Sequence, residues 1–115
     1  MVSQAKLRFL RASAQKTRLV ADQIRGRDVA EALGILKASP KRVARPIEKL
    51  LSSAIANAQQ HEERVDVDRL FVARVWVDEG PYEKRGRAAT MGRFFPILRK
   101  RAHVTIQLDL RGKRS

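Results

Sequence analysis

Residues 103–110 read HVTIQLDL, and the strict alternation of apolar and polar side chains in this stretch decides the fold class. A period of two over eight residues predicts a half-buried β-strand. One set is expected on the inner face of a sheet: Val104, Ile106, Leu108 and Leu110. The other set is expected to point outward: His103, Thr105, Gln107 and Asp109.

Two further segments have strand character. Residues 70–77, LFVARVWV, are rich in β-branched and aromatic residues, which strands favour. Trp76 in this run is expected in the core or at its edge rather than as a stacking residue for bases. Residues 2–11 alternate as well, and place Phe9 on the same face as Ala5 and Leu7.

Two helices are predicted directly after the strand at residues 2–11. The first covers residues 14–25, with Ser13 as its N-cap and Gly26 as its stop. The second covers residues 29–37 and starts behind Asp28, which has a residue type favoured at an N-cap. Apolar residues spaced by three and four give each helix one buried face.

A third helix is predicted between residues 41 and 60. Its apolar stripe consists of Val43, Ile47, Leu50, Leu51, Ala54, Ile55 and Ala58. Pro46 lacks a backbone N–H, so either the helix bends there or it begins nearby. The small residues of the run SSAIANA, residues 52–58, predict close packing of this helix on the sheet, with Asn57 as a satisfied amide.

The charge balance points to a polyanionic partner. The 115 residues contain 25 Lys and Arg against 12 Asp and Glu, for a net charge of +13. Nucleic acid is the first candidate, because phosphate binding releases condensed counterions. A membrane is not expected, because no apolar run or lipidation motif is present. The first residues are not expected to form a signal peptide.

Catalytic and metal-binding patterns are missing from the sequence. There is no Cys, the two His are far apart, and no phosphate-binding glycine loop occurs. Neither a cofactor, a metal nor a small-molecule substrate is expected. The acids Asp66 and Asp68 predict a solvated turn before a strand rather than a calcium loop.

Residues 78–102 connect two predicted strands and are too long for an ordinary hairpin loop. This segment carries seven basic residues, Lys84, Arg85, Arg87, Arg93, Arg99, Lys100 and Arg101, and past Gly80 only one acid, Glu83. It has no helical apolar stripe, so its simplest form is two extended arms that continue the flanking strands. Such arms bury too little apolar surface to be stable alone, and RNA is the most economical support.

Several motifs occur together in a fixed order along the chain. They are Ser13-x-x-Lys16-x-Arg18-Leu19-Val20, Ile24-Arg25-Gly26, SAIANA at 53–58, VDEGP at 77–81, Lys84-Arg85, Gly92-Arg93 and HVTI at 103–106. With these motifs the chain resembles the large-subunit ribosomal protein twenty-two family over nearly its whole length. The resemblance implies an α+β fold: three helices packed on a three-stranded antiparallel sheet, with a long protruding basic β-hairpin. One domain, residues 1–115, would include this hairpin as residues 80–102.

The resemblance also implies a function. The chain would be a structural constituent of the large ribosomal subunit and not an enzyme. It would bind large-subunit (23S-type) rRNA, aid subunit assembly, and line the nascent-peptide exit tunnel with its hairpin. Its partners would be this rRNA, neighbouring large-subunit proteins and the nascent peptide, in a cytoplasmic ribosome, with an organellar ribosome left open. The alternative is a free-standing basic nucleic-acid-binding or RNA-chaperone protein.

Two sets of site residues follow. The rRNA-binding set is Arg8, Arg11, Lys16, Arg18, Arg25, Lys84, Arg85, Arg87, Arg93, Arg99, Lys100, Arg101 and His103. The tunnel-facing tip is Thr90, Met91, Gly92, Phe94 and Phe95. The tip departs from the family pattern, because Ala88-Ala89-Thr90 replaces a Pro-Arg-Ala run and Phe94-Phe95-Pro96 replaces small or polar residues. The two adjacent rings either pack on rRNA and the opposite arm, or present at least one ring to the tunnel lumen.

Overall fold

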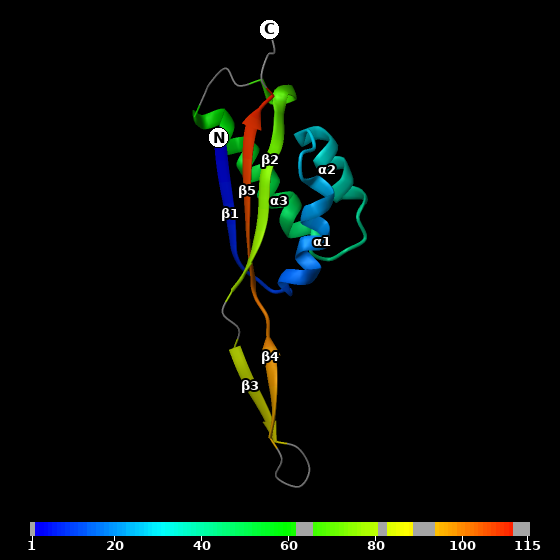
Figure 1. The fold of residues 1–115 in the computed structure, drawn as a ribbon, viewed down its shortest axis with the longest axis vertical. Coiled ribbons are helices and arrows are strands. Elements are labelled where there is room, and N and C mark those ends of the chain that lie inside the picture. The colour runs from blue at the N-terminus through cyan, green and yellow to red at the C-terminus, as the bar shows by residue number, and fades with distance from the viewer. Residues whose placement is uncertain (1, 62–65, 81–82, 89–93, 112–115) are drawn as a thin grey trace.

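The computed structural model describes residues 2–61, 66–80, 83–88 and 94–111. Its elements in chain order are β1 (Ser3–Leu10), α1 (Ala14–Ile24), α2 (Val29–Ala38), α3 (Ala44–His61), a 3-10 turn (Val67–Arg69), β2 (Leu70–Glu79), β3 (Glu83–Ala88), β4 (Phe94–Arg99) and β5 (Ala102–Leu110). Figure 1 shows a body of helices and three strands, from one end of which β3 and β4 extend. The whole measures 71 × 26 × 20 Å.

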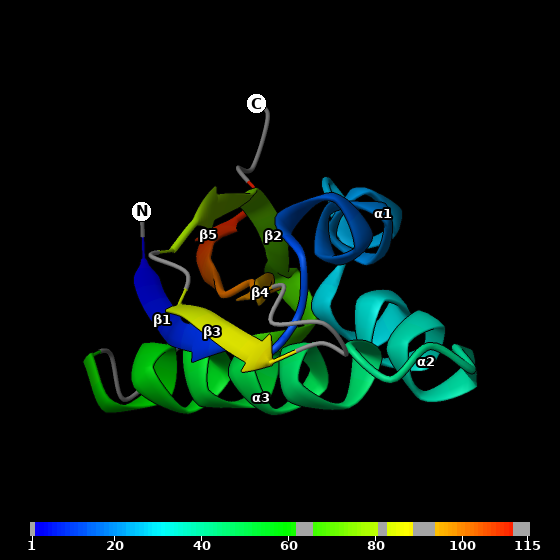
Figure 2. The ribbon, with the colours of Figure 1, turned by 90° about the horizontal axis from the view of Figure 1, so that it is seen from below.

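The strand that alternates most regularly lies at the centre of the sheet. The order is β1-β5-β2, and both neighbours run antiparallel to β5. In the register, Ile106 lies between Ala5 and Val75. The helices cover one face of this sheet, with α3 against β1 and β5, α1 against β2, and α2 against α1 and α3 (Figure 2). The predicted α+β class, with three helices on a three-stranded antiparallel sheet, is confirmed.

The core consists of the predicted apolar faces. Its largest fully buried side chains include Val20, Ile24, Leu36, Ile47, Leu51, Leu70, Val72, Val104, Ile106 and Leu108. Pro46 lies in the first turn of α3, where a missing N–H removes no helical bond. Of the two predicted alternatives, the helix that starts near Pro46 is therefore the correct one.

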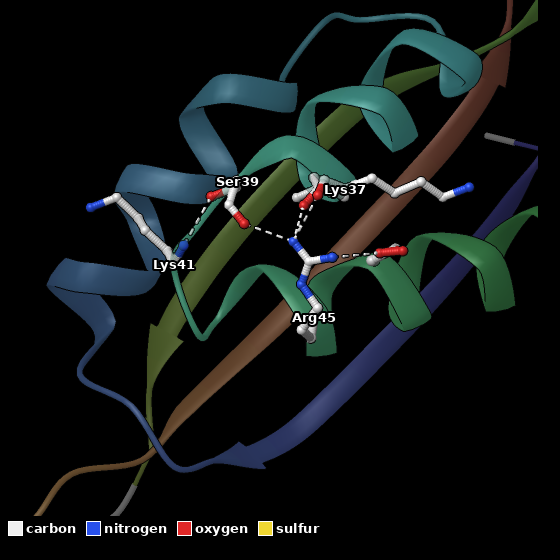
Figure 3. A network of polar contacts seen from close by, with 6 residues as sticks. Lys37, Ser39, Lys41 and Arg45 are labelled. Carbon is white, nitrogen blue, oxygen red and sulfur yellow. Dashed lines mark hydrogen bonds and ion pairs between the residues drawn. The ribbon is translucent and has the colours of Figure 1, made fainter.

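The ends of α2 are held by side chains that the sequence did not reveal. Asp28 occupies the N-cap position, but its side chain makes no cap bond and instead accepts from Arg111 Nε at 2.6 Å. At the other end, Arg45 Nη2 donates to the carbonyl oxygens of Leu36 at 2.6 Å, Lys37 at 3.2 Å and Ser39 at 2.7 Å (Figure 3). One guanidinium thus binds three carbonyls at the end of the helix, and that of Leu36 also accepts from the backbone N–H of Ser39.

Thr105 lies on the outer face of the sheet, as predicted, but it is buried there, because β5 is central and Thr105 lies between Lys6 and Trp76 on its neighbours. Two predictions about sheet faces need correction. Trp76 is half-buried on that outer face and does not join the core. Phe9 does not share the face of Ala5, because the register of β1 shifts between Leu7 and Leu10.

Strands β3 and β4 form a separate two-stranded antiparallel sheet. Pairing in the three-stranded sheet ends at Glu79↔Ala102, and pairing in the second sheet runs from Glu83↔Arg99 to Ala88↔Phe94. We name this pair of strands the extension. The limits 80–102 remain a prediction. Four of the predicted site residues lie outside the described residues: Thr90, Met91, Gly92 and Arg93.

Candidate nucleic-acid interface

Exposed cations gather where the extension leaves the body. The end of β1, the start of α1 and the start of β5 meet there (Figure 1). We name the basic residues that these segments and the adjoining loops carry the junction cluster: Lys6, Arg8, Arg11, Lys16, Lys100 and Arg101. All are exposed except Arg101, which is half-buried. Five of the six belong to the predicted rRNA-binding set, and Lys6 is the addition that the structure suggests.

Two predicted RNA-binding arginines on α1 have an internal role. Arg18 Nη2 donates to the carbonyl oxygen of Val77, and Arg25 Nη2 donates to that of Val75, both at 2.8 Å. These carbonyls belong to β2, an edge strand that would otherwise present unpaired acceptors. Arg25 also forms an ion pair with Asp22, and it lies at the end of α1 away from the junction. Arg18 and Arg25 therefore fasten the helix to the sheet, and their exposed guanidinium groups keep further donors.

The predicted RNA-binding His103 also has an internal role. Its Nδ1 accepts a hydrogen bond from the backbone N–H of Phe9 at 3.0 Å, which leaves the neutral ring its proton on Nε2. On its other side the ring lies against Gly80, where a Cβ would come within 3.0 Å of Nε2. His103 thus links β1 to the point where β2 ends.

Beside His103 lies a shallow cavity of about 230 Å³. It is lined by Lys6, Arg8, Phe9, Asp78, His103 and Thr105. Sequence reasoning missed this site, because a simple alternation along β1 would turn Phe9 toward the core. The shift of register that exposes it depends on pairing with residues almost a hundred positions away.

The extension supplies four further predicted cations, and Arg93 lies outside the described residues. Lys84, Arg85 and Arg87 lie on β3, and Arg99 ends β4. The backbone register places Arg85 opposite Ile97 and Arg87 opposite Phe95. Phe94 and Phe95, the two predicted tip residues within the described part, are the first two residues of β4.

Other kinds of site find no support in the described part of the chain. None of its helices combines the length and apolarity that crossing a membrane requires. Nor do its residues bring together three His, Cys, Asp or Glu side chains, as a metal centre would need.

The fold and this surface define a class of small, strongly basic α+β proteins whose cations gather at the base of a two-stranded extension. A family model described as Ribosomal protein L22p/L17e matches residues 5–109. The large ribosomal subunit protein uL22 of Solibacter usitatus (strain Ellin6076) is 48% identical over 108 residues, which cover 94% of this chain and 96% of that relative. The uL22 protein of Anaeromyxobacter sp. (strain K) is 48% identical over 104 residues, which cover 90% of this chain and 71% of that relative.

The chain belongs to this family of large-subunit ribosomal proteins, whose members are structural and not enzymatic. The predicted resemblance is therefore confirmed. Membership also decides against the alternative of a free-standing nucleic-acid-binding protein.

Proposed function

We propose that this chain binds large-subunit rRNA through the junction cluster and the cations of the extension. The observation that carries the proposal is the extension itself, a separate two-stranded sheet at one end of the body. An isolated pair of strands is marginal in water. Residues 81–102 carry seven basic residues against one acid, and phosphates would relieve the repulsion between these charges.

The junction cluster supports the same partner from the side of the body. Its cations come from two regions that are distant in sequence, residues 6–16 and residues 100–101, which meet at the root of the extension. A polyanion running along the extension would therefore meet further positive charge where it reaches the body. Arginine guanidinium groups suit this role, because they bind phosphate in a bidentate manner and stack on exposed bases.

The finer roles follow from the family resemblance. The chain would aid folding of the rRNA during subunit assembly, beside neighbouring large-subunit proteins in a cytoplasmic ribosome. The extension would run inward through rRNA to the peptide exit tunnel. Thr90, Met91, Gly92, Phe94 and Phe95 are the residues proposed to meet the nascent peptide.

Sedimentation of a cell lysate tests where the chain resides. The tagged full-length chain should migrate with large subunits through a sucrose gradient and remain there after a moderate salt wash. Recovery at the top of the gradient, or with chromosomal DNA, would contradict the proposal.

Salt dependence of binding tests the role of the cations. Each phosphate contact adds roughly 0.7–0.9 to the slope of log affinity against log salt. Replacing Arg99, Lys100 and Arg101 by alanine should weaken binding to large-subunit rRNA and make this slope shallower by about two to three. A matched control removes the same charge from the helical side of the body, at Lys37, Lys41 and Arg42. Equal loss of slope in both variants would mean that the binding is non-specific attraction to a cationic chain.

A further inference from the structure

Phe9 adopts a backbone conformation that is costly for a residue with a side chain. Its φ is +59°, in the left-handed region that glycine tolerates and phenylalanine does not favour. The cause is a β-bulge. Leu7 pairs with Val104 and Leu10 pairs with Ala102, so that Arg8 and Phe9 together lie opposite the single residue His103. Bulges of this kind redirect a side chain, and here the ring of Phe9 leaves the inner face of the sheet.

The stability of the free chain gains little from this arrangement. Phe9 is 57% exposed, one of two large hydrophobic residues mostly in contact with water among the residues whose burial the structure describes. A glycine at this position would remove both the strained φ and the exposed apolar surface. Strain that the fold does not require is characteristic of functional positions.

The ring is nevertheless held in a fixed position. The backbone N–H of Phe9 donates to His103 Nδ1 at 3.0 Å, and the two rings meet edge to face with centroids 4.9 Å apart and planes at 85°. His103 is held in turn by its close approach to Gly80. A side chain that is already ordered loses little entropy when it binds a flat ligand.

The surroundings of the ring select the ligand. Lys6 and Arg8 line the same cavity of about 230 Å³ and offer cations to a phosphate. Asp78 also lines the cavity, and its carboxylate would repel a phosphate inside it but accept a hydrogen bond from an N–H group. One cavity thus joins an aromatic face, an acceptor for N–H groups and two cations, a combination that fits a nucleotide whose base enters the cavity while its backbone stays outside.

We propose that Phe9 is a stacking platform for one unpaired base of large-subunit rRNA, with Lys6 and Arg8 on the adjoining phosphates and Asp78 on the edge of the base. This inference rests on the proposed rRNA binding and adds a particular site to it. Unpaired bases that stack on aromatic side chains are the usual targets of sequence-selective RNA recognition. The site would therefore add recognition of a particular base, which phosphate contacts along the extension cannot supply because they carry no sequence information.

The test compares substitutions that keep apolar bulk but remove the aromatic face. The full-length chain is titrated with protein-free large-subunit rRNA over a series of salt concentrations. Phe9→Leu should lower the affinity by roughly 5- to 150-fold, the usual contribution of one stacked base, with no change in the salt slope. Phe9→Tyr should bind like the original chain. The control is Phe71→Leu. Phe71 lies on the same sheet, and Arg111 Cζ already lies over its ring at 4.5 Å from the centroid. This substitution should therefore leave the affinity unchanged.

Two further measurements locate the effect. Base-specific chemical probing of the rRNA should find one nucleotide that becomes more reactive when Phe9→Leu replaces the original chain. Phe9→Gly should melt at the same temperature as the original chain or higher, because it relieves the left-handed strain. A lower melting temperature would mean that the ring serves the fold, and would overturn the inference.

Failure of the platform is distinguishable from failure of the proposed function. If the original chain prefers large-subunit rRNA over small-subunit rRNA, and Phe9→Leu binds equally well, the platform is wrong and the function stands. If the original chain shows no such preference, the proposed function fails. Equal losses in Phe9→Leu and Phe71→Leu, or in Phe9→Leu and Phe9→Tyr, would also overturn the platform.

Discussion

In the body, three helices bury one face of a three-stranded sheet, whereas β3 and β4 of the extension form a separate two-stranded sheet. In the body, side chains of the helical layer pair with backbone carbonyls at both edges of the sheet. Arg18 and Arg25 donate to carbonyls of β2, and Asn57 Nδ2 donates to Gln4 O of β1. The extension instead carries four cations, Lys84, Arg85, Arg87 and Arg99, and one acid, Glu83. The contrast indicates that the chain stabilises the body by its own contacts, while the proposed contact with rRNA would stabilise the extension.

The largest effect on the free energy of unfolding is expected in the apolar core of the body. Leu51 is fully buried in α3, at the centre of the apolar stripe. Leu51→Ala should lower the free energy of unfolding by about 2–5 kcal/mol, through lost burial and the cavity left behind. Denaturant unfolding followed by circular dichroism measures it. The exposed neighbour provides the control, and Ser52→Ala should change the free energy by less than about 0.5 kcal/mol. A loss in Leu51→Ala no larger than in this control would contradict an internally stabilised body.

A smaller loss is expected at the end of α2. Arg45→Ala removes three bonds to carbonyls, but its side chain is 51% exposed and water can replace part of them. We expect the free energy of unfolding to fall by about 1–2 kcal/mol. Arg42→Ala removes the same charge from an exposed position next to it and should have little effect. Equal losses in both variants would assign the effect to net charge rather than to the helix end.

The contacts of Arg45 are of a kind that the sequence alone does not predict. Periodicity and cap residues placed the three helices of the body correctly to within a few residues, because these signals are local. The contacts of Arg45 with Leu36 and of Arg18 with Val77 depend on how the chain returns on itself, which no local pattern contains. The same holds for the bulge at Phe9. Its extra residue becomes visible only when β1 is paired with β5.

The candidate site was predictable to the same extent. Clusters of basic residues predicted the position of the extension and proposed nucleic acid as its partner, because charge can be read from the sequence. Which cations are exposed, and which fasten the fold, required the structure. Lys16 is exposed on α1, while Arg18 one half-turn later binds a strand carbonyl.

Alanine substitutions at two glycines compare the packing at the boundary between body and extension with that of an open helical position. Gly80 lies where the body ends, and a Cβ there would come within 3.0 Å of His103 Nε2 and 3.2 Å of Arg101 Cβ. Gly80→Ala should therefore lower the free energy of unfolding by about 1 kcal/mol. Gly34 lies in α2 with nothing within 4 Å of an added Cβ, so Gly34→Ala should raise it by about 0.5–1 kcal/mol. Thermal melting of both variants measures the difference, and a change of the same sign in both would mean that the junction is not closely packed.

The smallest effect on the body, and the most specific effect on function, is expected at the far end of the extension. Phe94 pairs with Ala88 and Phe95 with Arg87, so both residues adjoin the predicted turn. Adjacent residues of a strand point to opposite faces, and the two rings therefore cannot easily pack on one surface. If the tip meets the tunnel, a ring exposed there would narrow the passage and offer an apolar surface to nascent chains and tunnel-binding drugs. We expect Phe94→Ala and Phe95→Ala to change translational pausing or macrolide sensitivity while subunit assembly stays nearly intact. Ribosome profiling with drug titration measures the first, and sedimentation of the subunits measures the second. Impaired assembly with unchanged pausing and drug response would instead make the rings anchors for RNA, and the extension would then be a binding element along its whole length.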